Sequence, residues 1–182
     1  MTSCGRLIAV VGPSGVGKDS MIYGISAARP ELQPVRRVIT RPVESGGEDH
    51  VSVSEDAFIR LREAGAFCLS WGAHGLFYGI PKEVVAEVTA GAQRLANLSR
   101  GILTEAQAVF PEIVVLNITA KPETLALRLA GRRRETPEQI IERLMQADKP
   151  LPAEMDVLNL VNDGDLEDTI NLALKMLQPT RE

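Results

Sequence analysis

The chain carries, near its N-terminus, the first seven positions of the phosphate-binding pattern G-x-x-x-x-G-K-[ST]. These positions are Gly12, Pro13, Ser14, Gly15, Val16, Gly17 and Lys18. The glycines let consecutive backbone N–H groups turn inward around a phosphate, and the start of a following helix adds positive potential. A lysine at the end of the loop neutralises the β and γ phosphates of a nucleoside triphosphate. The pattern therefore predicts ATP binding, the alternative being a glycine-rich turn that binds nothing.

The residue after the lysine departs from the pattern, because Asp19 stands where serine or threonine is usual and the hydroxyl follows at Ser20. A carboxylate beside a triphosphate is repulsive unless a cation lies between them. We therefore expect Asp19 to ligate Mg²⁺ directly or through water. The alternative is that Asp19 only places a favourable charge in the first turn of the helix.

Positive charge is gathered at two points of a chain whose net charge is -4. One group is Arg36, Arg37 and Arg41, and the other is Arg132, Arg133 and Arg134. Nucleic acids and anionic membranes are bound by a broad positive field, which an acidic chain lacks. Clustered arginines on an acidic background instead predict a small polyanion as the partner.

Strands and helices alternate along the chain, and this order has to position the loop and the arginines. The expected core strands are 7–11, 35–39, 94–98, 113–118 and 157–161. Helices are expected at 19–28, 101–110, from about 122, at 137–147 and at 166–177. Thr136, Pro137 and Gln139 form a capping box at the start of the fourth of these. The fold class predicted is α/β, with a five-stranded, mainly parallel sheet flanked by helices.

The segment from Thr40 to about Gly91 interrupts this alternation. It predicts a short strand at 51–53, a helix capped by Ser54, strands at 67–71 and 76–78, and a helix starting at Pro81. We interpret it as a small insertion within one domain of 182 residues, a length that suits a single core.

Composition is that of an ordinary globular protein, with 45% hydrophobic residues and two cysteines, Cys4 and Cys68. Two separated cysteines match no metal-site spacing and suit a reducing compartment. The short apolar run near the N-terminus is too short for a membrane span and lacks a basic leader. These features predict a cytoplasmic protein.

Several motifs together resemble the guanylate kinase family over nearly the full length: Gly12 to Lys18, Thr40-Arg41-Pro42, Gly47-Glu48, Phe77-Tyr78-Gly79 and Gly131-Arg132. The resemblance implies a parallel-sheet core, an acceptor-binding insertion and an arginine-bearing lid at about 131–137. It also implies that Arg41 and Tyr78 hold the acceptor phosphate, that Arg132 and Arg143 stabilise the transferring group, and that adenine lies near Asn162. From the residues alone, Arg132 also fits a solvated charge run and Tyr78 fits core packing.

The residues that read guanine in that family are not retained. Ser70 stands where a carboxylate precedes the tryptophan, and Glu44 replaces the second acceptor arginine. His50 replaces a tyrosine, and Ile80 replaces a small hydroxyl residue. A site without hydrogen-bond partners for a base rejects that base, so guanylate is a poor candidate.

These departures, with the sequence Asn97-Leu98-Ser99-Arg100, are similar to those of the bacterial ribose 1,5-bisphosphate phosphokinase family. That resemblance implies ATP-dependent conversion of ribose 1,5-bisphosphate to 5-phosphoribosyl 1-diphosphate, with ADP release, in phosphonate catabolism. We expect Arg37, Arg41 and Arg100 to divide the two sugar phosphates among them. Asp49, His50 and His74 are candidates for the ribose hydroxyls or a water on the metal, although histidines near glycine turns also occur in ordinary loops. A guanylate kinase and a non-catalytic binding module remain as alternatives.

Overall fold

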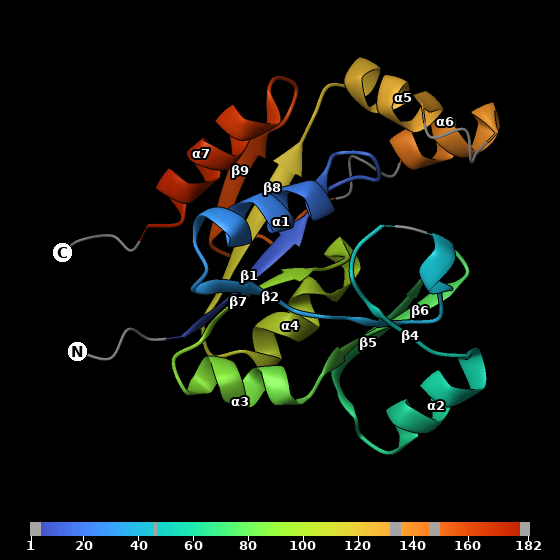
Figure 1. The fold of residues 1–182 in the computed structure, drawn as a ribbon, viewed down its shortest axis with the longest axis vertical. Helices are drawn as coiled ribbons and strands as arrows, with labels where there is room; N and C mark the ends of the chain where they lie inside the picture. Colours follow the sequence, from blue (N-terminus) through green and yellow to red (C-terminus); the bar gives the residue numbers. More distant parts are fainter. Residues whose placement is uncertain (1–4, 46, 132–135, 146–149, 179–182) are drawn as a thin grey trace.

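Two sheets make up the strand framework of the computed structural model, which describes residues 5–45, 47–131, 136–145 and 150–178. The larger is a parallel sheet in the order β2-β7-β1-β8-β9 (Figure 1). Its strands are β1 (Arg6–Val11), β2 (Leu32–Pro34), β7 (Gln93–Asn97), β8 (Ile113–Thr119) and β9 (Val157–Val161). The predicted α/β class with five core strands is confirmed.

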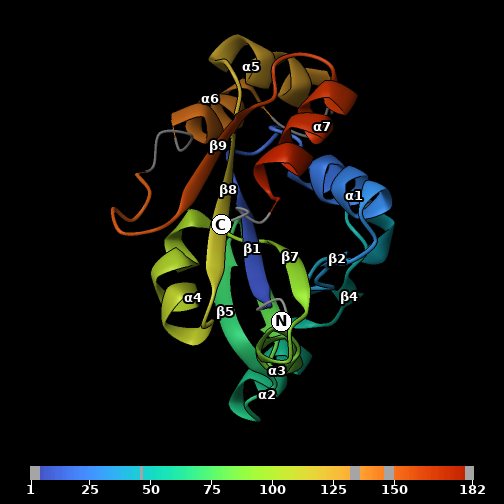
Figure 2. The same cartoon turned by 90° about the vertical axis from the view of Figure 1, so that its left-hand side faces the viewer.

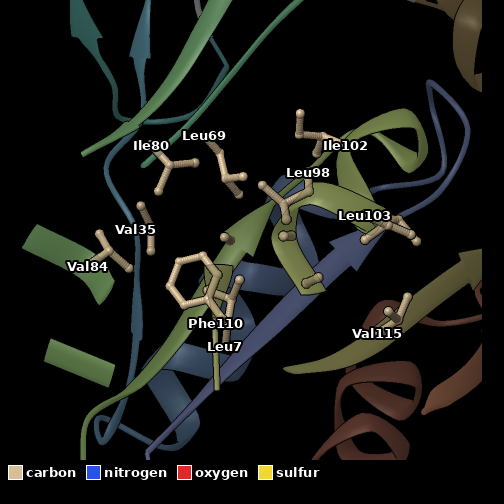
Figure 3. Close-up of a cluster of buried hydrophobic side chains, with 14 of the residues drawn as sticks. Leu7, Val35, Leu69, Ile80, Val84, Leu98, Ile102, Leu103, Phe110 and Val115 are labelled. Carbon is tan, nitrogen blue, oxygen red and sulfur yellow. The ribbon is translucent and has the colours of Figure 1, made fainter. Parts of the chain in front are cut away.

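The central strand β1 is apolar on both faces because each face is covered by helices. Leu7, Ala9 and Val11 belong to one buried cluster, whereas Ile8 and Val10 belong to another. The first cluster, drawn in Figure 3, includes side chains of α3 (Glu83–Thr89) and α4 (Leu103–Val109). The second includes side chains of α1 (Lys18–Ala28) and α7 (Leu166–Met176). Figure 2 shows α1 and α7 on one side of the sheet and α4 on the other.

The smaller sheet has the order β4-β3-β6-β5 and lies within the segment expected to be an insertion. Its strands are β3 (Val38–Ile39), β4 (Val51–Ser52), β5 (Phe67–Ala73) and β6 (Leu76–Pro81). Helix α2 (Glu55–Glu63) packs on it through Phe58, whose ring stacks on Phe67 and Phe77. As predicted, Ser54 caps α2, and its Oγ accepts a hydrogen bond from the N–H of Ala57 at 3.2 Å.

The prediction of one strand over 35–39 is wrong. The chain leaves the larger sheet after β2, where the N–H of Val35 makes a last bond to the oxygen of Leu95 at 2.7 Å. It then joins the smaller sheet at Val38, which is opposite Gly79. Between these strands the side chain of Arg37 turns inward and is buried. An apolar pattern shows that a segment is buried but not which sheet it joins. The prediction therefore missed β2 and assigned to the larger sheet the residues of β3, which pair in the smaller one.

The hairpin between β5 and β6 is longer than predicted, because its turn needs only two residues. His74 and Gly75 have φ angles of 53° and 73°, and two left-handed residues in succession suit a tight hairpin turn. Pro81 is the last residue of β6 instead of the first of a helix, and α3 begins at Glu83.

Helices α5 (Pro122–Gly131) and α6 (Pro137–Met145) pack against each other beyond the carboxyl end of the larger sheet (Figure 1). The predicted capping box at α6 is confirmed. The N–H of Thr136 donates to Oε1 of Gln139 at 2.9 Å, and the N–H of Gln139 donates to Oγ1 of Thr136 at 3.4 Å. None of the helices described here is long and apolar enough to cross a membrane.

Candidate active site

The loop from Gly12 to Gly17 joins the end of β1 to the start of α1, as the phosphate-binding pattern requires. Gly15 and Gly17 have φ angles of 83° and 96°, which favour glycine. A Cβ on Gly12 would lie 2.4 Å from the backbone oxygen of Ile118, so the sheet itself leaves no room for a side chain there. The loop geometry thus depends on glycine at these positions.

Lys18 curls back over the loop that precedes it. Its Nζ donates hydrogen bonds to the backbone oxygens of Gly12 at 2.9 Å and Pro13 at 3.2 Å. The ammonium group is therefore held at the mouth of the loop, where it can meet the outer phosphates of a triphosphate.

Two side chains brace the loop from behind. Nδ2 of Asn162 donates to the backbone oxygen of Val16 at 2.8 Å, and Nη1 of Arg128 donates to the same oxygen at 3.3 Å. Nη2 of Arg128 also donates to the backbone oxygen of Asn162 at 2.8 Å. Asn162 is 3% exposed and does not line the cavity described below, so its contacts in this structure support the loop.

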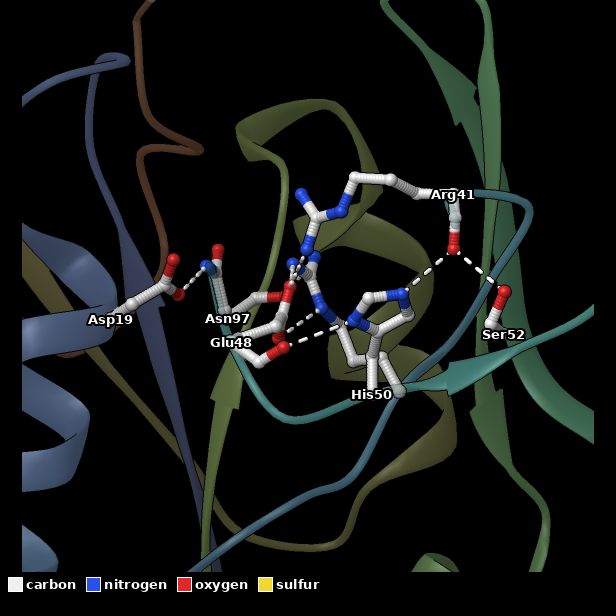
Figure 4. Close-up of polar contacts among 7 residues, drawn as sticks. Asp19, Arg41, Glu48, His50, Ser52 and Asn97 are labelled. Carbon is white, nitrogen blue, oxygen red and sulfur yellow. Dashed lines mark hydrogen bonds and ion pairs between the residues drawn. The ribbon is translucent and has the colours of Figure 1, made fainter. Parts of the chain in front are cut away.

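Asp19 points toward the carboxyl end of β7, where Asn97 stands. Nδ2 of Asn97 donates a hydrogen bond of 2.8 Å to Oδ1 of Asp19 (Figure 4). Among the described residues no group of three His, Cys, Asp or Glu side chains could hold a metal ion. One oriented carboxylate beside a phosphate loop nevertheless fits Mg²⁺, which typically takes one or two carboxylates and completes its shell with phosphate oxygens and water.

A cavity of about 450 Å³ opens between the phosphate loop and the smaller sheet. The loop side consists of Gly12 to Ser20 without Val16. The opposite side includes Arg37, Arg41, Glu48, Trp71, His74 and Tyr78, and the carboxyl end of β7 contributes Asn97, Ser99 and Arg100. A volume of this size suits a small organic ligand.

Arg37 and Glu48 form the most buried ion pair in the described chain, with side chains 7% and 13% exposed. Nε of Arg37 donates to Oε2 of Glu48 at 3.0 Å, and Nη2 donates to Oε1. Nη1 of Arg37 donates to the backbone oxygen of Asn97 at 2.9 Å. Three donors of this guanidinium are thus bound within the protein.

Arg41 stands on the other side of Glu48, with Nη2 3.8 Å from Oε1. In contrast to Arg37, its Nε and Nη2 are buried, and among the described residues neither meets a hydrogen-bond acceptor. Buried guanidinium N–H groups are costly to leave without acceptors. Arg41 is therefore the described arginine best placed to receive an anion in the cavity.

His50 holds the segment that carries Arg41 and Glu48. Its Nε2 lies 2.9 Å from the backbone oxygen of Arg41, and its Nδ1 lies 3.0 Å from the backbone oxygen of Glu48 (Figure 4). Oγ of Ser52 donates to the same oxygen of Arg41 at 2.8 Å. His50 is 4% exposed and does not line the cavity, so its role in this structure is to fix the backbone.

Of the other residues expected to bind the acceptor, three line the cavity and one lies outside it. Tyr78, His74 and Arg100 line the cavity, and Nη2 of Arg100 donates to Oδ1 of Asn117 at 3.2 Å. Asp49 is outside the cavity, where its exposed side chain pairs with Arg36 at 3.1 Å.

The two arginines expected to stabilise the transferring group fall outside what the structure describes. Arg132 lies outside the described residues altogether. Arg143 belongs to helix α6, but its side chain lies outside the description.

Sequence reasoning missed Asn97, Trp71 and Arg128 as parts of the site. Asn97 could have been predicted from the sequence, since a polar residue that ends an apolar parallel strand lies at the edge of the sheet where ligands bind. Arg128 could not, because its partners at Val16 and Asn162 are 112 and 34 residues away in sequence.

No protein-family model matches the chain. It is 47% identical to the ribose 1,5-bisphosphate phosphokinase PhnN of Ruegeria sp. (strain TM1040), over 97% of this chain and 94% of the relative. It is 41% identical to the protein of the same name from Agrobacterium fabrum, over 94% of this chain and 96% of the relative. Among solved structures, a guanylate kinase from Anaplasma phagocytophilum superposes with a TM-score of 0.66 at 19% identity, covering 97% of this chain and 85% of that one. That likeness extends to the fold, whereas the two relatives match along nearly their whole length, so the chain belongs to the ribose 1,5-bisphosphate phosphokinase family.

Proposed function

We propose that the protein transfers the γ-phosphoryl group of ATP to the C1 phosphate of ribose 1,5-bisphosphate. The products are 5-phosphoribosyl 1-diphosphate and ADP, and the reaction serves phosphonate catabolism. The names of the family relatives support this substrate. The observation that carries the proposal is that one cavity is lined both by the phosphate loop and by Arg41 and Arg100.

The chemistry requires alignment of two anions more than acid–base catalysis. An oxygen of the C1 phosphate attacks the γ phosphorus, and the bond from that phosphorus to the β–γ bridging oxygen breaks. The attacking oxygen is already ionised near neutral pH, so no general base is required. Positive groups on both sides of the cavity bring the reactants together and offset the repulsion between them.

On the donor side, Lys18 and the loop N–H groups bind the triphosphate. Mg²⁺, when bound, would be held by Asp19 and would offset charge on the β and γ phosphates. Arg132 and Arg143, from the proposed lid at about 131–137 and the helix after it, stabilise the transferring group. Adenine binds near Asn162, at the end of β9.

On the acceptor side, we propose that the insertion at about 40–91 holds the sugar. Arg41 and Arg100 bind its phosphates, with Arg37 beside them, and Tyr78 contributes to the phosphate site. His74 is placed to meet a ribose hydroxyl. Neither Asp49 nor His50 lines the cavity. His50 acts on the sugar through the backbone of Arg41 and Glu48, and Asp49 is paired with Arg36.

The test is a phosphoryl-transfer assay with ATP, Mg²⁺ and a panel of acceptors. The panel contains ribose 1,5-bisphosphate, ribose 5-phosphate, GMP and gluconate, and ³¹P NMR identifies the product. We expect a diphosphate at C1 only with ribose 1,5-bisphosphate, and no transfer in the Lys18→Ala variant. Transfer to GMP with no reaction of the sugar bisphosphate would instead identify a guanylate kinase.

A further inference from the structure

An aromatic surface lies inside the cavity, opposite the phosphate loop. Trp71 and Tyr78 are directly opposite each other on β5 and β6, with ring centroids 5.4 Å apart and planes 8° from parallel. Both residues line the cavity. Aromatic side chains of this kind are the surfaces on which nucleobases stack in many binding sites.

The guanidinium of Arg37 covers this surface. Its central carbon lies 4.9 Å from the ring centroid of Tyr78 and 5.9 Å from that of Trp71. A guanidinium is planar and stacks on aromatic faces, so it takes the place that a planar base would need.

Arg37 is also fixed in this place. The fork to Glu48, 11 residues away in sequence, and the bond to the backbone oxygen of Asn97, 60 residues away, hold it from two sides. Moving it aside would leave Glu48, whose side chain is 13% exposed, without its main counter-charge. An entering ligand therefore meets a covered aromatic surface.

We propose that Arg37 is a specificity-determining residue that excludes nucleoside monophosphates from the acceptor site. Its guanidinium occupies the ring faces of Trp71 and Tyr78, so that a base cannot stack there. The cavity is left to acceptors that have phosphates and hydroxyls but no aromatic ring. This inference rests on the proposed function, since it concerns the acceptor half of the same site.

The experiment exploits Trp71, the only tryptophan of the chain, whose fluorescence reports directly on this surface. GMP and UMP are titrated into the wild-type protein and into the double variant Arg37→Ser, Glu48→Gln, which removes the cover together with the negative charge that Arg37 neutralises. Saturating ADP is present to occupy the phosphate loop. We expect saturable quenching in the variant, with an affinity roughly tenfold or more above that of the wild type, as stacking of one base provides.

Two further single variants serve as a control and as an independent test. Arg36→Ser removes a neighbouring arginine that does not line the cavity, and it should bind nucleotides as weakly as the wild type. Arg37→Lys keeps a charge beside Glu48 but loses the planar group, so it should gain nucleotide binding as well. If circular dichroism shows that the double variant does not fold, nucleotide binding by Arg37→Lys tests the proposal in its place.

Two outcomes overturn the proposal: quenching by GMP in the wild type at an affinity equal to the variant's, or folded Arg37 variants that bind no nucleoside monophosphate better than the wild type. Neither depends on turnover of ribose 1,5-bisphosphate. Failure of the wild type to phosphorylate that sugar would contradict the proposed function and leave the fluorescence comparison intact.

Discussion

Asn97 orients Asp19: its side-chain amide donates a hydrogen bond of 2.8 Å to Oδ1 of the carboxylate. The backbone oxygen of the same asparagine accepts from Arg37 at 2.9 Å. Asn97 therefore contacts Asp19, next to the phosphate loop, and Arg37, on the opposite side of the cavity, at once. It lies at the carboxyl end of β7, next to the strand that precedes the phosphate loop.

Replacing Asn97 with alanine should weaken Mg²⁺-dependent activity. Loss of a partner that orients a metal-binding carboxylate typically costs about 10–100-fold in metal affinity or activity. Titration of Mg²⁺ at saturating ATP measures the shift, and Mg²⁺-dependent ATP binding by calorimetry gives a readout that is independent of turnover. Asn171→Ala, at an exposed position of α7, is the matched control. An unchanged Mg²⁺ titration in Asn97→Ala would show that this hydrogen bond does not serve the metal.

Replacing Arg41 with alanine should raise the KM for ribose 1,5-bisphosphate about 30-fold or more, because truncating one partner of a buried charged contact costs at least about 2 kcal/mol. The KM for ATP should stay near that of the wild type. Steady-state kinetics with each substrate varied in turn separates the two effects. Arg36→Ala removes an equal charge outside the cavity and should change neither constant by more than a small factor. A rise confined to the KM for ATP would place Arg41 on the donor side.

Replacing Gly12 with alanine should destabilise the protein and impair ATP binding together. The added Cβ would lie 2.4 Å from the backbone oxygen of Ile118, so either the loop or β8 must shift. Overpacking of this kind costs about 1–3 kcal/mol. Thermal unfolding with and without ATP measures both effects. Gly164→Ala has open space around the new Cβ and should leave both measurements near wild-type values.

The thiol of Cys68 should be unreactive near neutral pH. Burial raises its pKa from the ordinary value of 9.0 to about 11, and Sγ lies 3.6 Å from the backbone oxygens of Ile80 and Pro81. Only the thiolate reacts with iodoacetamide, so alkylation at pH 8 should be about a hundredfold slower than that of a free cysteine. The alkylation rate is measured in a Cys4→Ser background, so that Cys68 is the only thiol that can react. A rate equal to that of free cysteine would mean that the thiol is open to water.

The same pKa shift gives a pH dependence of folding. Because the pKa is raised in the folded state, the stability from this group is complete below about pH 9 and is lost as the pH rises toward 11. Denaturant unfolding between pH 8 and 11 should show a steeper loss for the native sequence than for Cys68→Ala. Equal slopes would contradict the assignment.

Local signals predicted the parts of this fold that depend on neighbouring residues. The phosphate loop lies between β1 and α1, Ser54 caps α2, and Thr136 forms its capping box with Gln139, because each depends on residues a few positions apart. The switch from the larger sheet at β2 to the smaller sheet at β3 was missed because the strand pattern does not encode which partner a strand finds.

The sequence identified the arginines that lie at the site, but not the contacts that each of them makes there. Arg37 and Arg41 were expected to act alike as phosphate ligands, and those roles stay predictions. Their surroundings nevertheless differ, since Glu48 and Asn97 bind the first, while Nε and Nη2 of the second find no acceptor among the described residues. The difference arises from contacts across as many as 60 residues of sequence, which no local pattern reports.

Oγ of Ser52 donates to the backbone oxygen of Arg41, and the two ring nitrogens of His50 lie 2.9 Å from that oxygen and 3.0 Å from the backbone oxygen of Glu48. The entropy of ordering the backbone that carries Arg41 and Glu48 is therefore lost during folding and not when a ligand arrives. Capture of the sugar bisphosphate should then proceed at a rate set by diffusion and electrostatic attraction, with no slow rearrangement of this segment after encounter.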